Sequence, residues 1–558
     1  MILNRFFFAV LVLCMITCIS GIVLIPLMDI DASQYASISR ELLEGKHILQ
    51  FYDLGADYLD KPPMLFWLSA LSLKIFGIYD WAYRLPSFVF AIIAVYATFR
   101  LAHLWYGKTV AQLSAMILAS SQAFFLITHD VRCDTMLMGW VMLSLWQLSA
   151  WFEKGKWKYF ITAFVAIAGG MLTKGPIALI VPVLAFLPHF ILKREWKQLF
   201  RWEYLVGLLI IAILLIPMSI GLYQQYDLHP GKLINGHPIQ SGLRFYYWTQ
   251  SFGRYTGENV YHEMSYFNFL FENMLWSFLP WIIFFLIGLG FAFWDLLMSR
   301  FWIKSKLEFI TIGGFFFTYC ILARSQAQLP HYIFVVFPLA AIVTAVFIHR
   351  LYFLSANSKL SQILFGFHAF IFTILWLAVA VLMYLPFKQV PIIMPILAVM
   401  GLLINCWILF RKQQGKPFPA LITSAFFTII SINLFLSTHF YPNLLQYQMG
   451  NTAADYINQH AMDKSKVVLY GVGDSRALHF YGKHLFTHKN SRNAIQESDI
   501  LITSTDSIGV FKKAFPLLKT LHTGANFSVS LLTAGFLNPQ TREQETPHYV
   551  ILDLDGKP

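Results

Sequence analysis

Residues 1–28 read MILNRFFFAVLVLCMITCISGIVLIPLM, a single arginine followed by a long and largely apolar run. A secretory signal peptide has a shorter apolar core and a cleavage site of small residues, so this segment predicts a retained first membrane span. Hydrophobic residues make up 57% of the chain and charged residues 13%, whereas soluble proteins carry about 45–50% and about 25%. The chain is therefore predicted to be an α-helical polytopic membrane protein.

Further apolar segments follow, each long enough to cross a bilayer. About 13 spans of about 20 residues are expected, near residues 6–28, 84–103, 109–128, 134–152, 158–173, 176–192, 203–223, 271–294, 308–323, 331–349, 361–385, 390–410 and 418–437. With the N-terminus inside, every inward connection carries lysine or arginine, as the positive-inside rule predicts. An odd number of spans then places the C-terminus outside. Topology thus accounts for the net charge of +12, and no nucleic-acid partner is expected.

Two outward connections are long, residues 29–83 and 224–270. In the first, Tyr35 and Ile38 recur at helical spacing, which predicts an amphipathic helix. Residues 64–77 are apolar but short, which is typical of a helix that lies on the membrane surface or dips into it. These connections are expected to hold the catalytic loops.

The composition changes after the last span. Strands are predicted for VVLYGV (467–472), DILITS (499–504) and YVILDLD (549–555), and helices for residues 450–460 and 474–483. We therefore expect a transmembrane domain over residues 1–437 and an outward α/β domain over residues 438–558.

Charged residues gather close to membrane level on the outward side, where charge beside hydrocarbon is costly and usually serves a substrate or an ion. Asp31 follows the first span, and Asp134 lies in THDVRCDTM at the outward start of the fourth. Outward connections are poor in cations, so those present need a reason. The residues at this face that suit a phosphate are Lys61, Arg84, Lys174, Arg254 and Tyr332. The alternative is that each cation snorkels to water or pairs with a neighbouring acid.

Together these residues indicate sugar transfer at the outer membrane surface, with a lipid phosphate as the leaving group. Because no nucleotide sugar is supplied outside the cell, the expected donor is a polyprenyl-phosphate sugar. Asp31 is the candidate base for the acceptor nucleophile, and Lys61 and Arg254 are candidate phosphate clamps. No cofactor is expected to be required, because lysine and arginine can neutralise the leaving phosphate; a divalent metal stays open as an alternative. The five cysteines include no CxxC pair, which argues against a disulfide framework or a thiolate metal site.

Several short motifs, taken together and in order, are specific to one group of proteins. The chain resembles the bacterial aminoarabinose transferases of lipid A, within the larger protein O-mannosyltransferase-like group of GT-C glycosyltransferases. The matches run in order over residues 1–350, as DASQYASISREL (31–42), YLDKPP (58–63), Arg84, Asp134, LTKG (172–175) and QLPHY (328–332). The resemblance implies a GT-C helical bundle in the bacterial inner membrane. Its N-terminus would be cytoplasmic, and its active site and C-terminal α/β domain periplasmic.

The resemblance also implies roles for individual residues. Asp31 would be essential, and Asp134 would support the site or hold the sugar. Lys61, Arg254 and Tyr332 would engage the lipid phosphate, with Arg84 and Lys174 as further phosphate-binding residues. Substrate binding is expected from Tyr35 and Gln34. The implied reaction is an inverting transfer from a polyprenyl-phosphate sugar, among membrane lipids, to a lipid, glycan or protein acceptor.

Some positions depart from the family pattern. The second acid of the usual pair is Ala32, and the arginine three residues after the aspartate is Gln34. Asp29 is a candidate replacement for the missing acid, at a different spacing. A transporter or flippase of a lipid-linked saccharide is one alternative function, although it would need ionisable residues deep within several spans, which are nearly free of charge here. A non-catalytic relative is the other alternative.

Overall fold

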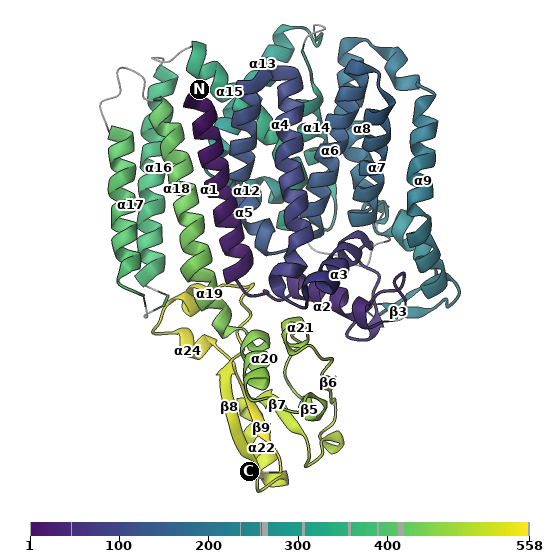
Figure 1. The fold of residues 1–558 in the computed structure, drawn as a ribbon, viewed down its shortest axis with the longest axis vertical. Coiled ribbons are helices and arrows are strands. Elements are labelled where there is room, and N and C mark those ends of the chain that lie inside the picture. Colours follow the sequence, from purple (N-terminus) through teal and green to yellow (C-terminus); the bar gives the residue numbers. More distant parts are fainter. Residues whose placement is uncertain are drawn as a thin grey trace.

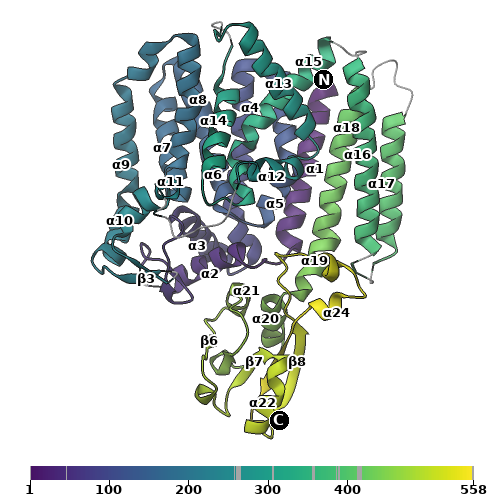
Figure 2. The same cartoon turned by 180° about the vertical axis from the view of Figure 1, so that it is seen from behind.

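The structure is a computed structural model that describes residues 2–45, 47–234, 236–256, 258, 266–303, 307–354, 359–384, 386–387, 390–410 and 418–555. A bundle of long helices forms the larger part, and a small domain built on a β-sheet hangs from one end of it (Figure 1). The N-terminus lies at the far end of the bundle and the C-terminus lies in the sheet domain (Figures 1 and 2). The predicted combination of a helical bundle and a C-terminal α/β domain is confirmed.

Apolar helices make up the bundle. They are α1 (Ile2–Leu24), α4 (Asp80–Ala119), α5 (Gln122–His129), α6 (Cys133–Lys154), α7 (Trp157–Lys174), α8 (Ile177–Lys193), α9 (Glu203–Leu222), α12 (Phe269–Ser277), α13 (Ile282–Met298), α14 (Ile310–Arg324), α15 (Phe337–Leu354), α16 (Lys359–Tyr384), α17 (Ile393–Phe410) and α18 (Phe418–Phe435). Among the described residues, seven helical runs are long and apolar enough to cross a membrane. The chain is therefore a multi-span membrane protein, as predicted.

The turn predicted between residues 103 and 109 is confirmed. α4 consists of two helices that are interrupted at Gly107, whose φ is 80°. Glycine adopts this left-handed conformation without the steric cost of a Cβ atom. The chain reverses there, because Gln112 bonds to Asn4 near the start of α1, whereas Arg84 and His129 meet at the other end of the bundle. The second helix ends at Ala119, and α5 completes the path expected for residues 109–128.

The connection from α1 to α4, the first of the two that were predicted to face outward, forms a layer across one end of the bundle. Its helices are α2 (Asp31–Glu44) and α3 (Met64–Phe76), and its hairpin pairs β1 (Tyr52–Asp53) with β2 (Ala56–Asp57). Both helices lie at the end of the bundle that faces the sheet domain (Figure 1). Tyr35 and Ile38 of α2 pack with Phe66 of α3 in one buried cluster. The two helices predicted in this connection are confirmed, and their apolar faces hold the layer together.

The second outward connection is mostly short helical turns. They are η2 (Tyr223–Asp227), α10 (Gly242–Arg244), η3 (Phe245–Thr249) and α11 (Gly253–Thr256), with a hairpin of β3 (Lys232–Ile234) and β4 (His237–Ile239). Gln225 donates to the backbone oxygen of Phe51 at 3.0 Å, and Lys232 pairs with Asp57 at 2.9 Å. These contacts join the two outward connections into a single layer.

The tail begins later than the boundary predicted at residue 437. Helical structure continues beyond α18 through η5 (Leu436–Phe440), α19 (Tyr441–Leu444) and η6 (Leu445–Tyr447). The sheet domain then opens with α20 (Met449–Gln459) and includes α21 (Arg476–Gly482), α22 (Ile508–Ala514), α23 (Ala534–Leu537) and α24 (Arg542–Glu545). The last helical run therefore reaches out of the bundle and carries the domain.

A five-stranded mixed sheet forms the centre of that domain, with the order β6-β5-β7-β9-β8. The strands are β5 (Val467–Leu469), β6 (Thr487–His488), β7 (Ile500–Ser504), β8 (Lys519–Ala525) and β9 (His548–Asp553). β5 runs parallel to β6 and β7, whereas β9 runs antiparallel to β7 and β8. The three buried strands match the predicted apolar runs. The edge strands β6 and β8 were not predicted, because their partly exposed residues lack an apolar pattern.

Candidate functional site

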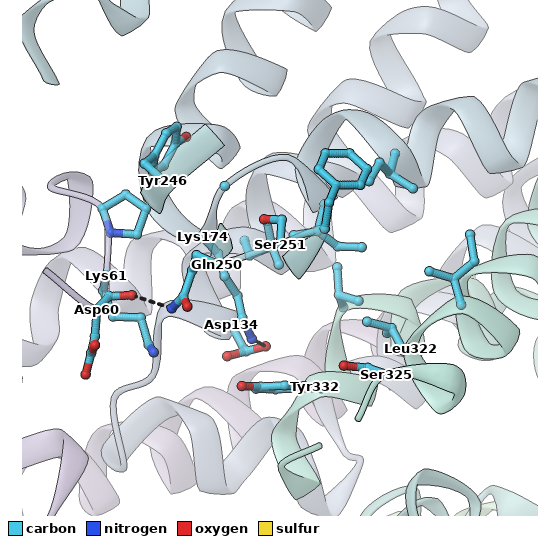
Figure 3. Close-up of a pocket in the computed structure, with 18 of the residues that line it drawn as sticks. Asp60, Lys61, Asp134, Lys174, Tyr246, Gln250, Ser251, Leu322, Ser325 and Tyr332 are labelled. Atoms are coloured by element: carbon cyan, nitrogen blue, oxygen red, sulfur yellow. Dashed lines mark hydrogen bonds and ion pairs between the residues drawn. The ribbon is translucent and has the colours of Figure 1, made fainter. Parts of the chain in front are cut away.

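A pocket of about 360 Å³ opens where the outward layer meets the bundle. Its polar residues come from several separate parts of the chain (Figure 3). They include Asp60 and Lys61 before α3, Asp134 on α6, Lys174 at the end of α7, Gln250 and Ser251 after η3, Ser325 after α14 and Tyr332 before α15. Much of the remaining wall is apolar, including Leu137, Ile177, Ile180, Phe252 and Leu322. The pocket therefore combines an apolar wall with a small set of charged groups.

The deepest charged pair is Lys174 with Asp134. The Lys174 Nζ lies 2.5 Å from Oδ1 of Asp134, and His331 Nε2 lies 3.6 Å from the other carboxylate oxygen. Asp134 is only 2% exposed, and the Lys174 ammonium sits 3.9 Å from the ring centroid of Tyr332. α7 ends at Lys174 because Gly175 follows with a φ of 94°. The helix end thus presents the lysine to the pocket, and Asp134 holds it there.

Lys61 differs from Lys174 in forming no ion pair with an acid among the described residues. Its side chain lines the pocket, and within the described part of the chain it has neither an ion pair nor a hydrogen bond. The neighbouring Asp60 accepts a hydrogen bond at its backbone oxygen from Gln250 Nε2 at 2.9 Å, which fixes the loop that carries Lys61. An ammonium group held at a pocket wall without a carboxylate is available to bind an anion.

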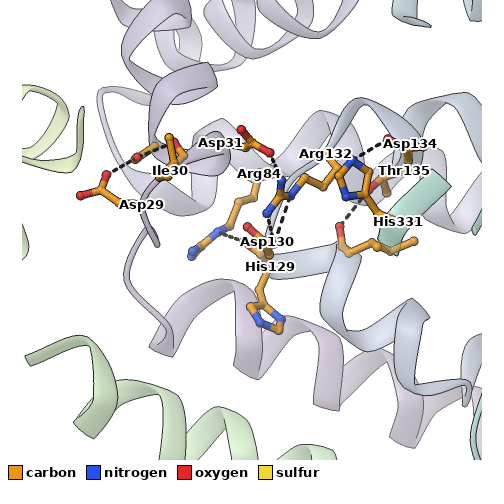
Figure 4. Close-up of polar contacts among 12 residues, drawn as sticks. Asp29, Ile30, Asp31, Arg84, His129, Asp130, Arg132, Asp134, Thr135 and His331 are labelled. Carbon is orange, nitrogen blue, oxygen red and sulfur yellow. Dashed lines mark hydrogen bonds and ion pairs between the residues drawn. The ribbon is translucent and has the colours of Figure 1, made fainter. Parts of the chain in front are cut away.

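Asp31 stands beside the pocket rather than in its lining. Its carboxylate forms an ion pair with Nη1 of Arg132, and its side chain is 32% exposed. Asp130 accepts from Nε and Nη2 of the same arginine at 3.1 and 3.0 Å (Figure 4). Burial raises the pKa of Asp130 to about 7, although the nearby Arg84 guanidinium opposes the rise. The candidate base is therefore neutralised by an arginine in this structure.

Arg132 was not among the predicted residues. It stands in THDVRCDTM two positions before Asp134, in an outward connection. The scarcity of outward cations, which selected Lys61, applies equally to Arg132. His331 was missed as well, although it lies next to Tyr332 in the quoted QLPHY motif.

The prediction that Arg84 binds phosphate is contradicted by its contacts. The side chain is 1% exposed and is not part of the pocket lining. Nε donates to the backbone oxygen of His129 at 2.8 Å, and Nη1 and Nη2 donate to the carbonyls of Ile22, Ile25 and Pro26 at 2.6–3.0 Å. Those carbonyls lie at and just beyond the end of α1, where no further helical turn can bond them. Arg84 therefore closes the end of α1 instead of facing a ligand.

Gln34 and Tyr35 also lie outside the pocket lining. Gln34 Nε2 donates to Asp53 Oδ2 at 2.6 Å, and the same oxygen pairs with Arg476 of the sheet domain at 3.2 Å. The Tyr35 ring packs edge-on against Phe66. These contacts give both residues a structural role, so a part in substrate binding stays a prediction.

Asp29 does not replace the missing second acid of the family pattern. Its carboxylate accepts hydrogen bonds from Ser33, from Ser475 Oγ at 2.5 Å and from the Ala477 backbone N–H at 3.2 Å. Burial raises the pKa of Asp29, although these hydrogen bonds oppose the rise. The carboxylate thus joins the α1–α2 turn to α21 of the sheet domain and faces away from the pocket.

Arg254, the remaining predicted phosphate clamp, belongs to α11, and its side chain lies outside the described residues. α11 follows directly after Ser251 and Phe252, which do line the pocket. Of the predicted residues, the structure therefore brings Lys61, Asp134, Lys174 and Tyr332 together in one pocket. It places Asp31 beside that pocket through Arg132.

Comparison with known proteins agrees with this arrangement. Residues 60–220 match the family model described as dolichyl-phosphate-mannose-protein mannosyltransferase. The undecaprenyl phosphate-alpha-4-amino-4-deoxy-L-arabinose arabinosyl transferase of Edwardsiella ictaluri is 27% identical over 58% of this chain and 55% of its own length. The protein of the same name from Pseudomonas aeruginosa is 27% identical over 45% of this chain and 44% of its own length. The chain thus spans about half the length of the curated relatives that it matches.

Similarity of fold extends much further. The crystal structure of ArnT from Cupriavidus metallidurans in the apo state covers 99% of this chain and 98% of its own, with a TM-score of 0.73 at 15% identity. The structure of the same ArnT bound to undecaprenyl phosphate gives 0.73 at 17% identity, with the same coverage. The predicted resemblance is therefore confirmed: the chain is similar in sequence to aminoarabinose transferases over about half of its length, and it shares the fold of ArnT over nearly all of it.

Proposed function

We propose that this protein transfers a sugar from a polyprenyl-phosphate donor to an acceptor at the outer face of the bacterial inner membrane. The observation that carries the proposal is a pocket with an apolar wall that holds both Lys174 and Lys61, and Lys61 has no partner among the residues that the structure describes. A phosphate would lie against the two ammonium groups, and the first prenyl units would lie along the apolar wall. The similarity to a protein that binds undecaprenyl phosphate supports the same donor class here.

In the proposed reaction, an acceptor hydroxyl attacks the anomeric carbon from the side opposite the phosphate. The new carbon–oxygen bond forms as the bond from the anomeric carbon to the phosphate oxygen breaks, so the configuration inverts. The electron pair of the broken bond stays on the phosphate, where Lys61 and Lys174 stabilise it. The proton of the hydroxyl passes to the carboxylate of Asp31. The products are the glycosylated acceptor and polyprenyl phosphate.

Asp134 is proposed to position Lys174 rather than to take the proton, because both of its oxygens already face cationic or imidazole groups. We propose that no metal is needed, since the two lysines supply the positive charge that the leaving phosphate requires. Adding a chelator would then leave transfer unchanged. A fall in rate that divalent metal restores would contradict this part of the proposal.

The proposed orientation places the N-terminus in the cytoplasm and both the pocket and the sheet domain in the periplasm. Cysteine substitutions at exposed positions would test it in intact cells. A membrane-impermeant thiol reagent is expected to label Gly509→Cys in the sheet domain and not Lys156→Cys between α6 and α7. Labelling in the reverse pattern would overturn the orientation.

The function is tested by supplying purified protein and a membrane extract with a panel of radiolabelled polyprenyl-phosphate sugars. The wild type is compared with Asp31→Asn and with Lys74→Ala, a matched change at an exposed lysine on α3 outside the pocket. Transfer by the wild type and by Lys74→Ala, but not by Asp31→Asn, would support the proposal, and the labelled product would identify the acceptor. Binding of the lipid without transfer by any of these proteins would favour a flippase or a non-catalytic relative.

A further inference from the structure

Arg132 is held at three of its nitrogen positions. Nε and Nη2 both donate to Oδ2 of Asp130, at 3.1 and 3.0 Å, and Nη1 pairs with Asp31. The guanidinium therefore has one anchored edge and one nitrogen that bridges to the candidate base (Figure 4). Its side chain is 20% exposed, so this bridge borders on solvent.

The bridge has a chemical consequence for Asp31. The guanidinium pairs with the carboxylate and competes with an acceptor hydroxyl for it. The arrangement seen here therefore holds Asp31 in a state that is poorly suited to take a proton from an acceptor. For Asp31 to act as the base, Arg132 must release its carboxylate during the reaction.

A phosphate bound in the pocket would be an alternative partner for Arg132. The arginine directly precedes α6, whose Asp134 lines the pocket, and Figure 4 places its guanidinium between Asp31 and Asp134. Electrostatic interactions link Arg132 to Asp134 and to Tyr332, both of which line the pocket. Because Asp130 keeps two nitrogens in place, Nη1 can change partner without withdrawal of the whole side chain.

We propose that Nη1 of Arg132 exchanges Asp31 for the phosphate of the lipid-linked donor, so that donor binding frees Asp31 to act as the base. The inference rests on the proposed function and adds to it a link between the donor site and the base. Arginine suits this role because its planar fork can hold Asp130 and an anion at the same time. Lysine has three donors on one nitrogen and no planar fork, so it could not hold Asp130 through two nitrogens while a third changes partner.

The charge changes of the reaction favour the exchange. The donor is a phosphodiester with one negative charge. When the bond from its phosphate oxygen to the anomeric carbon breaks, the oxygen keeps the electron pair and the product becomes a monoester of about −1.5 to −2. At the same step Asp31 accepts the proton of the acceptor hydroxyl and becomes neutral. The attraction of Arg132 to the phosphate therefore grows as its attraction to Asp31 disappears.

The exchange predicts that Asp31 and polyprenyl phosphate compete for Arg132. The experiment measures binding of polyprenyl monophosphate to the purified full-length protein in detergent, for the wild type, Asp31→Asn, Arg132→Met and the double variant. We expect Asp31→Asn to bind about three- to tenfold more tightly than the wild type and Arg132→Met to bind more weakly by a similar factor. In the double variant the gain from Asp31→Asn should vanish, which is the non-additivity expected of coupled residues.

If Arg132 only braces the loop, Asp31→Asn would bind no more tightly than the wild type, and that result would overturn the inference. Arg476→Met, which removes the arginine paired with Asp53 on the same outward face, is the matched control and should leave affinity unchanged. An equal loss of affinity in this control would likewise count against a specific role for Arg132.

The comparison of Asp31→Asn with the wild type tests the inference even if Arg132→Met fails to fold. A wild type that transfers sugar but shows no gain of affinity in Asp31→Asn refutes the exchange alone, whereas one that neither binds nor transfers any polyprenyl-phosphate sugar refutes the proposed function as well.

Discussion

The pocket and the joint between α2 and α21 both hold buried or half-buried carboxylates near the end of the bundle that carries the sheet domain, yet their hydrogen bonding differs. At the joint, Asp29 accepts from Ser33, Ser475 and the Ala477 backbone, and Arg476 pairs with Asp53. In the pocket, Lys61 is left without a partner among the described residues. Satisfied polar groups hold two parts of a protein together, whereas an unpaired charge at a cavity wall is kept for a ligand.

Arg84 and Lys61 show this contrast directly, because the sequence predicted that both of them bind phosphate. Arg84 meets four backbone carbonyls and Lys61 faces the pocket. Substitutions can therefore distinguish a residue whose hydrogen bonds stabilise the fold from a residue that binds a ligand in the pocket.

The largest effect is expected from Arg84→Ala. The change leaves several buried carbonyls without a donor, and each such group costs about 1–3 kcal/mol, so a loss of at least about 3 kcal/mol in the free energy of unfolding is expected. Thermal unfolding of the purified protein would show it as a marked fall in apparent Tm. Arg324→Ala, at an exposed arginine that ends α14, is the control and should leave Tm nearly unchanged. A stable Arg84→Ala protein that has lost only transfer would restore the phosphate-binding role.

Lys61→Ala should have the opposite profile. Removing a charge that stabilises the leaving phosphate is expected to lower kcat/KM by about 10²–10³-fold, with little change in Tm. Steady-state transfer assays with a polyprenyl-phosphate sugar provide the measurement, and Lys61→Arg should recover part of the rate because it keeps the charge. If Lys61→Ala instead lowers Tm markedly and leaves kcat/KM unchanged, the contrast between pocket and joint fails.

Asp29→Asn tests the joint through its pH dependence. The raised pKa of Asp29 means that its stabilising contribution is present below the ordinary aspartate pKa of about 4 and is lost as pH rises through the raised value. The wild type should therefore lose apparent Tm with rising pH over this range relative to Asp29→Asn, which keeps the acceptor oxygen but does not titrate. Parallel pH profiles for the two proteins would show that burial at the joint does not perturb Asp29.

Gln34→Ala should have the smallest effect, about twofold or less on transfer, because Gln34 bonds to Asp53 and Arg476 still pairs with that carboxylate. Initial rates at saturating and at low donor concentration would reveal any change in KM. A tenfold rise in KM would return Gln34 to the substrate site.

Much of the fold could be predicted because membrane helices and buried strands carry strong one-dimensional signals. The apolar spans, the helix at residues 64–77 and the strands β5, β7 and β9 all follow from local composition. The edge strands β6 and β8 could not be predicted in this way, because their partly exposed residues lack an apolar pattern.

The candidate site, too, could be predicted only in part from the sequence. The scarcity of cations in the connections predicted to face outward indicated Lys61 and Lys174, which line the pocket, but also Arg84, which does not. The same criterion applies to Arg132, which the quoted family motifs do not include. Residue type and topology say that a charge is present on a given face, but they do not say which partner it meets.

By itself, the sequence determined that this chain crosses the membrane many times, carries an α/β domain at its C-terminus and gathers charge on one face. Hydrophobicity and periodicity act along the chain, so they can be inferred without knowing which segments meet. The tertiary structure alone decided that Asp134 holds Lys174, that Arg132 holds Asp31 and that Asp29 belongs to a joint. Ion pairs and hydrogen bonds act over a few ångströms between residues far apart in sequence, and only the packing of the helices sets those distances.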